Sequence, residues 1–361
     1  MGLLGGGLFY QEGIPGVVVS ELKPGGRLRR PWGRWVGTGA MAAVLLVIGY
    51  AWYQLAPAAP HSQRYDYVRV SPGQSASEIA ATLVHRGIIR SALAFNILSR
   101  LDHLSRSLKS GVYRLSPHDS LGTILRVMRS GQVVVIKVAI PEGFTAQQVV
   151  ARLVRAHIGT FEQYQKLERT PPAGMPKPLP GVRDALEGFL FPATYSFPWG
   201  TTAPQAISIM WRNFQTQAIQ PLYRRAHTQL TLTAWVTMAS IIQQENRSPK
   251  DAPDIAAVFF NRMALGMPFQ SDATVRYALG HVVMGGLSYQ DLQVISPYNT
   301  YLHAGLPPGP IANPGLVALS AALHPAKVPY LYFLTMRNGR VLFATTYPQH
   351  LANIAYANAH P

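Results

Sequence analysis

The chain has 361 residues, of which 48% are hydrophobic and 13% are charged, and its formal net charge is +16. This composition excludes a disordered protein, and the length allows two or three compact domains. The chain has no cysteine, which excludes disulfides and thiolate metal sites, and its histidines show no metal-ligand spacing, so we expect no cofactor. The charge favours an anionic partner, such as phospholipid, nucleic acid or an acidic polymer.

A segment long enough to cross a bilayer follows a basic tail at residues 1–34. Residues 35–57 contain no charge and include GAMAAVLLVIGYAWYQLA, about 20 apolar residues, the length of a transmembrane helix. The basic tail is expected to stay in the cytoplasm. A cleavable signal peptide and a buried core helix are the alternatives. We predict a single-pass helix in the cytoplasmic (inner) membrane of a bacterium, with the C-terminal part in the periplasm.

Residues 65–135 alternate short strands with capped helices. The candidate strands and helices follow one another at 65–70, 71–87, 111–115, 116–131, 133–140 and 141–157. Ser75 and Glu78 have the spacing of a capping box, and Ser120 precedes an amphipathic segment. This pattern predicts a small α+β module, which either only packs or binds a carbohydrate polymer.

From about residue 137 to residue 361 the chain reads as helices separated by loops rich in proline, glycine, asparagine and tyrosine. LPPGPIANPG at 306–315 is such a loop, and its proline and glycine fix the backbone path without regular structure. Rigid loops with polar groups often carry binding sites. The predicted fold is therefore α+β: one N-terminal transmembrane helix, a small α+β module at 65–135 and a mainly helical domain at 137–361.

A lone carboxylate ends the most apolar helix of this domain. No residue from 226 to 244 is charged, and then Glu245 follows. Met238, Ile241 and Ile242 precede it by helical spacings and share its face. Burial and the negative end of the helix dipole are both expected to raise the pKa of Glu245. A carboxyl group that is protonated near neutral pH is what a general acid for a glycosidic oxygen requires.

Two further expectations attach to this helix. Gln243 and Gln244 are predicted to point away from the side of Glu245. The simpler interpretation of Glu245 itself is a surface carboxylate paired with Arg247 or Arg262. The sequence of the helix leaves both interpretations open.

Two loop regions after this helix are rich in groups that suit a sugar chain. Residues 266–280 and 296–315 interleave amides, hydroxyls and aromatic rings, which can pair with sugar hydroxyls and stack on sugar rings. The candidate substrate-binding residues are Gln270, Ser271, Asp272, Thr274, Tyr298, Asn299, Tyr301 and Asn313.

Several stretches of this chain resemble one known family. They are IPEGFT at 140–145, LEGFLFPATYSF at 186–197, ASIIQQE at 239–245, VFFNRMALGMPFQSDATVRYALG at 258–280, SPYNTYLHAGLPPGPIANPG at 296–315 and LHPAKVPYLYF at 323–333. In order and content they resemble the endolytic murein transglycosylases of the MltG (YceG-like) type. A membrane helix followed by a LysM-like module at 65–135 also fits the layout of that family.

The resemblance implies a lyase that cleaves the β-1,4 bond between N-acetylmuramic acid and N-acetylglucosamine within nascent peptidoglycan strands. The product is a 1,6-anhydro end, and strand elongation stops. The catalytic glutamate of the family falls on Glu245, as general acid and base. The resemblance also implies peptidoglycan strands as substrate, membrane lipid around one helix, and peptidoglycan synthases as candidate partners.

Three positions depart from the family pattern. Gln243 replaces a glutamate, Ala193 replaces an aspartate, and a histidine before the C-terminal pattern is missing, although Thr346, Tyr347 and His350 are present. A lysozyme-like muramidase that uses Glu245 and Asp272, and a non-catalytic glycan-binding scaffold, are the alternative functions. A nucleic-acid binder is not expected, because the chain has a membrane segment and lacks a basic aromatic platform.

Overall fold

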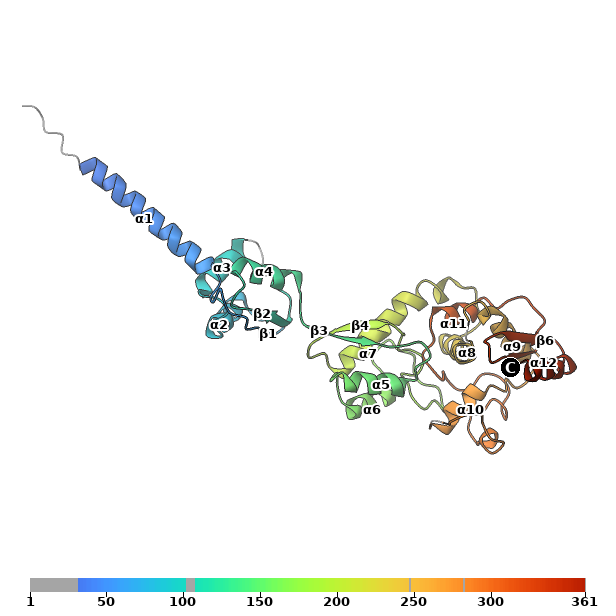
Figure 1. Cartoon of the computed structure of the whole chain (residues 1–361). Coiled ribbons are helices and arrows are strands. Elements are labelled where there is room, and N and C mark those ends of the chain that lie inside the picture. Colours follow the sequence, from blue (N-terminus) through green and yellow to red (C-terminus); the bar gives the residue numbers. More distant parts are fainter. Residues whose placement is uncertain (1–31, 102–107, 247, 282, 361) are drawn as a thin grey trace, which may run out of the picture. The chain divides into compact units, whose positions relative to one another are not determined.

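The structure is a computed structural model that describes residues 32–101, 108–246, 248–281 and 283–360. Its contacts divide the chain into two units, Met1–Ala56 and Pro57–Pro361. The first unit contains helix α1 (Trp32–Leu55) (Figure 1). The window Thr38–Leu55 has a mean hydropathy of 1.4 with none of it buried, so α1 is long and apolar enough to cross a membrane. This helix matches the predicted segment, while the tail up to residue 31 lies outside the described residues.

The second unit begins with the predicted module of short strands and capped helices. Strands β1 (Asp66–Val70) and β2 (Gly111–Leu115) pair antiparallel. Three helices accompany this sheet: α2 (Ala76–His85), α3 (Ala92–Leu101) and α4 (Leu121–Ser130). The capping box of Ser75 with Glu78 and the cap of Ser120 are both confirmed. Leu83 and Phe95 are fully buried in this region, but the likeness to a LysM module stays a prediction.

The next segment builds a second small sheet. Strand β3 (Val135–Ala139) pairs antiparallel with β4 (Thr194–Pro198), which the sequence analysis did not predict. Helices α5 (Ala146–Arg155) and α6 (Phe161–Arg169) lie between these two strands in the chain. Helix α7 (Ala203–Phe214) follows β4 and continues into a π-helical turn, Gln215–Ile219. Thr145 caps α5 in a capping box with Gln148. The cap fixes where α5 begins, and this start later forms one side of the candidate site.

Helix α8 (Leu232–Glu245) is packed against α9 (Ala252–Ala264), α10 (Asp272–Leu279) and α11 (Leu316–Ala321) (Figure 1). It belongs to a large hydrophobic cluster that extends from Val138 to Ala322. The side chain of Trp235 is fully buried there and donates a hydrogen bond of 2.9 Å to the Leu319 carbonyl of α11. The absence of charge over residues 235–242 is therefore explained by burial, because an unpaired charged group is costly to bury.

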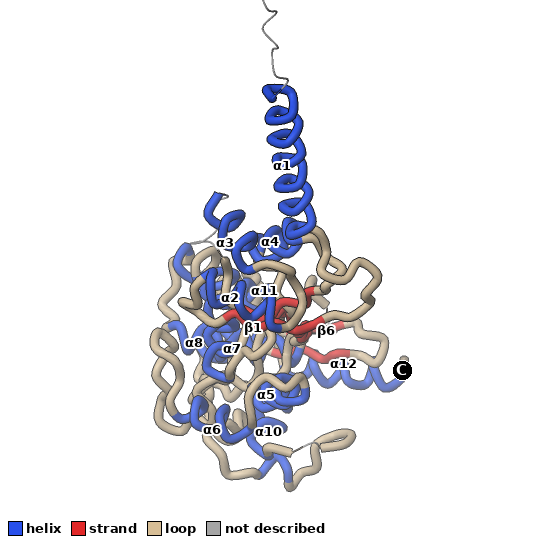
Figure 2. Tube along the Cα trace, turned by 90° about the vertical axis from the view of Figure 1, so that its left-hand side faces the viewer, coloured by secondary structure: helices blue, strands red, loops and turns tan. Residues whose placement is uncertain are grey.

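A hairpin and a helix end the chain. Strands β5 (Tyr332–Thr335) and β6 (Val341–Ala344) pair antiparallel, and helix α12 (Tyr347–Ala359) follows with Thr346 as its N-cap. Short 3₁₀ turns lie at Tyr223–Arg225 and Asp291–Gln293. Helices account for most of the regular structure and the strands are short (Figure 2). The expectation of a mixed, mostly helical fold is confirmed.

Candidate active site

Glu245 is the last residue of α8, as the sequence analysis predicted. Thr231 caps the start of the helix, and Asn246 leaves the helical conformation at its end. Ile241 and Ile242 are fully buried, so they fix the last turn against the core, while Glu245 itself is half-buried. The carboxyl group lines a hollow of about 420 Å³, which we call the Glu245 pocket. The described residues that line it are Gly143, Thr145, Gln148, Gln244, Glu245, Asp272, Ala273, Arg276, Tyr277 and Ile311.

The Glu245 carboxylate is held by a buried serine. The hydroxyl of Ser271 donates a hydrogen bond of 2.6 Å to Oε1 of Glu245, and Ser271 is only 4% exposed. The backbone of Ser271 is fixed in turn, because its N–H donates to the hydroxyl of Thr300 at 3.1 Å and its carbonyl accepts from the Thr274 hydroxyl at 2.7 Å. The position of the carboxylate is thus set by a chain of buried hydroxyl groups.

A second carboxylate lies in the same pocket. Asp272 is the first residue of α10, and its Oδ1 accepts a hydrogen bond of 2.7 Å from the Tyr301 hydroxyl. Burial and the hydrogen bond to Asp272 raise the pKa of the Tyr301 hydroxyl, so Tyr301 remains protonated and can donate at any physiological pH. The pair therefore supplies a fixed polar surface beside Glu245.

The opposite side of the pocket comes from the start of α5 and the residues before it. Nε2 of Gln244 donates a hydrogen bond of 2.7 Å to the carbonyl of Gly143, and both residues line the pocket. This corrects the expectation that Gln244 points away from the side of Glu245. Gln243 has a different contact, because its Oε1 accepts a hydrogen bond of 2.9 Å from the N–H of Gly315. The amide at position 243 therefore ties α8 to the loop before α11.

Several predicted substrate-binding residues lie beneath the pocket surface. Asn299 is fully buried, and its Nδ2 donates hydrogen bonds of 2.9 Å to the carbonyls of Leu292 and Val294. The other buried members of the set are Ser271, Thr274, Tyr298 and Asn313. In this structure the buried members stabilise the loops that frame the pocket. Asp272 lines the pocket, Tyr301 is half-buried beside it, and Gln270 is exposed.

Arg262 supports the loop that precedes Ser271. Its guanidinium group is 7% exposed and donates hydrogen bonds to the carbonyl of Phe269 at 2.9 Å and to Oε1 of Gln270 at 3.2 Å. Gln270 has a φ of +54°, a left-handed conformation that is uncommon for a residue other than glycine. Arg262 thus holds an unusual turn in place, whereas the simpler interpretation of Glu245 had Arg262 as its ion-pair partner on the surface. The other partner in that interpretation, Arg247, lies outside the described residues.

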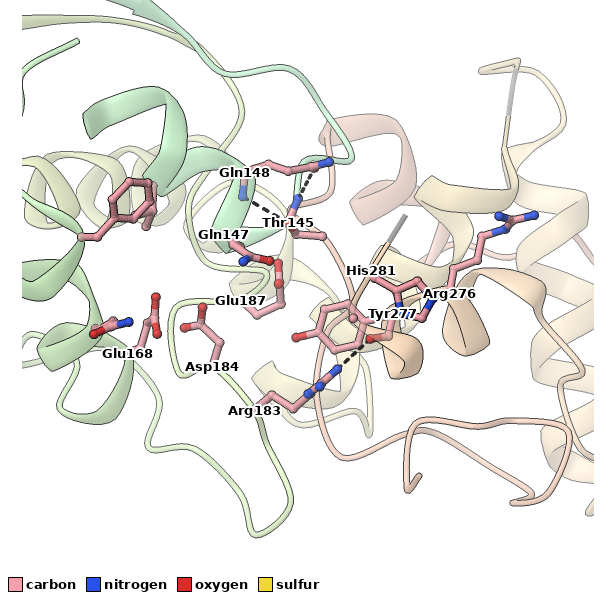
Figure 3. Close-up of a pocket in the computed structure, with 14 residues that line it drawn as sticks. Thr145, Gln147, Gln148, Glu168, Arg183, Asp184, Glu187, Arg276, Tyr277 and His281 are labelled. Atoms are coloured by element: carbon pink, nitrogen blue, oxygen red, sulfur yellow. Dashed lines mark hydrogen bonds between the residues drawn. The ribbon is translucent and has the colours of Figure 1, made fainter. Parts of the chain in front are cut away.

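A second hollow lies next to the Glu245 pocket. Figure 3 shows the residues that line it. It has a volume of about 550 Å³ and contains three carboxyl groups, those of Glu168, Asp184 and Glu187, so we call it the acidic pocket. It shares Thr145, Gln148, Arg276 and Tyr277 with the Glu245 pocket. The two hollows therefore share a wall.

Burial changes the protonation of the acidic pocket. It raises the pKa of Asp184 to about 7, with a further contribution from the charge of Glu168. Burial also raises the pKa of Glu187 well above the usual range for a carboxyl group. These residues were not predicted from the sequence, although one signal was present: Glu187 interrupts the apolar stretch LEGFLF. Over the described ranges, no group of three or more histidine, aspartate or glutamate residues could hold a metal ion.

The chain is similar to a protein family and to several named proteins. The model of the YceG-like family matches residues 68–356. A protein of Bacillus subtilis (strain 168) named endolytic murein transglycosylase is 32% identical over 323 residues, which cover 84% of this chain and 89% of that protein. A protein of the same name from Streptococcus pneumoniae (strain D39) is 30% identical over 348 residues, 87% of this chain. This chain spans 63% of the streptococcal protein.

A solved structure is also similar. The crystal structure of a yceG-like protein from Listeria monocytogenes matches with a TM-score of 0.56 and 35% sequence identity, over 81% of this chain and 100% of that chain. The region matched by the family model contains the Glu245 pocket and the acidic pocket in full. From the extent of these matches, the chain belongs to the YceG-like family.

Proposed function

We propose that the protein is an endolytic transglycosylase that cleaves peptidoglycan at the β-1,4 bond between N-acetylmuramic acid and N-acetylglucosamine. The observation that carries this proposal is the carboxylate of Glu245, which is oriented by the Ser271 hydroxyl in an open polar pocket. The relatives from Bacillus subtilis and Streptococcus pneumoniae, which are named endolytic murein transglycosylases, support the same substrate.

In the proposed reaction Glu245 acts twice. Protonated Glu245 first donates its proton to the glycosidic oxygen, and the bond from that oxygen to the anomeric carbon of N-acetylmuramic acid breaks. The C6 hydroxyl of the same sugar then bonds to the anomeric carbon and gives its proton to the Glu245 carboxylate. The sugar gains a 1,6-anhydro ring, no water is consumed, and Glu245 is protonated again. The raised pKa expected for Glu245 stays a prediction.

Asp272 is assigned a supporting part in this reaction. Its Oδ1 accepts the hydrogen bond from Tyr301, which orients the carboxylate within the pocket. A retaining or inverting hydrolase would need a second carboxylate, as nucleophile or as base for a water molecule. In a transglycosylase the substrate supplies its own nucleophile, so Asp272 need only position the sugar or the loop.

The apolar helix α1 supports a membrane-bound location for this activity. A helix of this length and composition fits a single-pass anchor in the cytoplasmic membrane. We propose that the part from Pro57 onwards lies in the periplasm, close to newly made strands and to the synthases that extend them. Cleavage within such a strand would end its elongation. The module at 65–135 would add LysM-like contact with the glycan.

Digestion of purified peptidoglycan in water enriched in ¹⁸O tests the proposed reaction. The full chain in detergent is expected to produce new 1,6-anhydro ends that carry no ¹⁸O, as measured by mass spectrometry of the released glycans. A muramidase would instead place one ¹⁸O atom at each new reducing end. A non-catalytic scaffold would give no new ends at all.

A further inference from the structure

Glu187 is a buried carboxyl group that the proposed reaction does not use. It is 2% exposed and lies in the loop before β4. Its Oε1 accepts a hydrogen bond of 2.9 Å from the N–H of Ala146, the first residue of α5. Figure 3 places Glu187 between the start of α5, at Gln147, and Tyr277 of α10.

The segment 143–146 that Glu187 contacts is a wall of the Glu245 pocket, and it is held at several points. The carbonyl of Gly143 accepts from Gln244, and the N–H of Gly143 donates to the carbonyl of Asn313 at 2.9 Å. The carbonyl of Phe144 accepts from Nδ2 of Asn313 at 2.8 Å, and the same Nδ2 lies 3.5 Å from Oε1 of Glu187. Glu187 therefore holds the C-terminal end of this segment, where α5 begins.

On its other side Glu187 reaches the opposite wall of the same pocket. The side chain of Tyr277 in α10 lies beside Glu187, and both residues line the acidic pocket (Figure 3). Helix α10 begins at Asp272, directly after the serine that holds Glu245. One carboxyl group thus holds the segment 143–146 and lies next to Tyr277 of α10, the helix that begins beside Glu245.

We propose that Glu187 is a positioning residue that ties the segment 143–146 to α10 and so sets the width of the groove beside Glu245. The inference rests on the proposed function, because it assigns Glu187 a part in holding the glycan strand in that groove. A small displacement of either wall would misplace the sugar relative to the Glu245 carboxyl group.

The protonation of Glu187 gives this role a pH dependence. Its titratable neighbours are Asp184 on the same loop, Tyr277 on α10 and Tyr298, with Glu168 and Arg183 next to these. Burial and the charge of Asp184 raise the pKa of Glu187. When the pH rises far enough to ionise Glu187, a buried negative charge forms beside Asp184. Water must then enter to solvate this charge, and the contact between the two walls is expected to loosen.

Three variants of the full chain test the proposal. Glu187→Gln keeps an oxygen for the N–H of Ala146 but cannot ionise, so kcat and KM at neutral pH should stay within about twofold of the wild type. Its KM should also lack the rise at alkaline pH that is expected of the wild type. Glu187→Ala removes the tie, so KM should rise about tenfold while kcat changes less. Glu168→Gln is the control, because it removes a carboxyl group from the acidic pocket without touching the segment 143–146.

Hydrogen exchange provides a readout that does not depend on catalysis. Mass spectrometry of the peptide around residues 140–150 should show faster exchange in Glu187→Ala than in the wild type. The chemical rate of amide exchange rises with pH in any protein, so the rates are first corrected for it. After this correction, the wild type should still lose protection in this peptide as the pH rises, while Glu187→Gln should keep its protection. Peptides from α8 serve as the internal reference.

Two results would overturn the proposal. The first is a Glu187→Ala variant whose KM and hydrogen-exchange rate around residues 140–150 equal those of the wild type. The second is a Glu187→Gln variant whose KM and hydrogen exchange change at alkaline pH in the same way as those of the wild type. If Glu187→Ala does not fold, the comparison of Glu187→Gln with the wild type decides alone. Failure of the proposed function would look different, because the wild type itself would then give no anhydro ends while the exchange comparison could still be made.

Discussion

The Ser271 hydroxyl donates a hydrogen bond of 2.6 Å to Oε1 of Glu245. Ser271 is the N-cap residue of α10, whereas Glu245 ends α8, so the contact joins two separate helices at the pocket. Because the backbone of Ser271 is fixed by Thr300 and Thr274, the carboxylate is oriented before any substrate arrives. Such preorganisation is a large part of what an active site supplies.

Replacement of Ser271 by alanine should therefore reduce catalysis more than stability. Ser271→Ala removes a hydrogen bond to a carboxyl group, which is worth about 1.5–3 kcal/mol, so kcat/KM should fall about 10- to 100-fold. Ser208→Ala is the matched control, because the Ser208 hydroxyl donates to the carbonyl of Pro204 in α7, within its own helix. Steady-state release of glycan fragments measures the effect. Wild-type kinetics in Ser271→Ala would show that the serine does not orient Glu245.

Asp272 and Tyr301 should behave as one unit. Tyr301→Phe removes the hydroxyl that donates to Oδ1 of Asp272, and Asp272→Asn weakens the same contact from the other side. Each change is expected to lower kcat/KM by less than about tenfold, and the double variant should lose no more than the larger single loss. Additive losses in this double-mutant cycle would mean that the two side chains act separately on the substrate.

The acidic pocket predicts a pH-dependent stability. Burial raises the pKa of Asp184 from 3.8 to about 7, so the stability linked to this group is fully present below pH 3.8 and is lost as the pH rises through 7. Asp184→Asn keeps an acceptor for the N–H of Leu186 and carries no charge. Its melting temperature should exceed that of the wild type at pH 8, and the difference should shrink towards pH 4.

Asp291 provides a control, because the stability that it contributes should change with pH in the opposite direction to that of Asp184. Hydrogen bonds from the hydroxyl and the N–H of Ser288 lower the pKa of Asp291 below its usual value of 3.8. Its contribution to stability is therefore present above pH 3.8 and is lost as the pH falls through the lowered pKa. Asp291→Asn should be slightly less stable than the wild type at neutral pH, with a smaller difference in acid. The same direction of pH dependence in both variants would refute the assignment for Asp184.

The glycine beside Glu187 should tolerate no side chain. Gly188 has a φ of +83°, and a Cβ atom added there would lie 2.5 Å from Cβ of Pro310 and 2.8 Å from Cγ1 of Val236. Gly266 has a φ of +68° but open space around it, so Gly266→Ala measures the backbone strain alone, about 1–2 kcal/mol. Gly188→Ala should lower the melting temperature well beyond Gly266→Ala. Equal shifts would mean that the packing around Gly188 can yield.

Local signals in the sequence predicted much of the fold. The capping box of Ser75 with Glu78, the cap of Ser120, the apolar helix with its terminal carboxylate, and the strands β1, β2 and β3 follow from spacing over a few residues. Strand β4 was not predicted, because its pairing with β3 joins residues far apart in the chain. The hairpin of β5 and β6 was missed as well, since its strands are short and mostly half-buried, so buried and exposed positions do not alternate.

The candidate site was predicted in composition but less well in arrangement. Ser271 and Asp272 do lie beside Glu245, yet Asn299 and Asn313 are buried and bind backbone groups. A polar residue in a loop can contact either a ligand or the backbone, and sequence alone does not distinguish the two. Gln244 was misplaced because a contact with Gly143, more than a hundred residues earlier, draws its side chain into the pocket.

The most direct test of the proposed function is to compare the glycan products of Glu245→Gln and Asp272→Asn, each in the full chain, by mass spectrometry. Glu245→Gln keeps an oxygen for the Ser271 hydroxyl but cannot donate an acidic proton, so the rate of anhydro-end formation should fall by about 10²–10⁴ with little change in melting temperature. Asp272→Asn should form the same anhydro ends at a much smaller loss. If Asp272→Asn is as inactive as Glu245→Gln at unchanged stability, or if the wild type forms reducing ends, then a two-carboxylate hydrolase is the correct account and the single-glutamate transglycosylase is not.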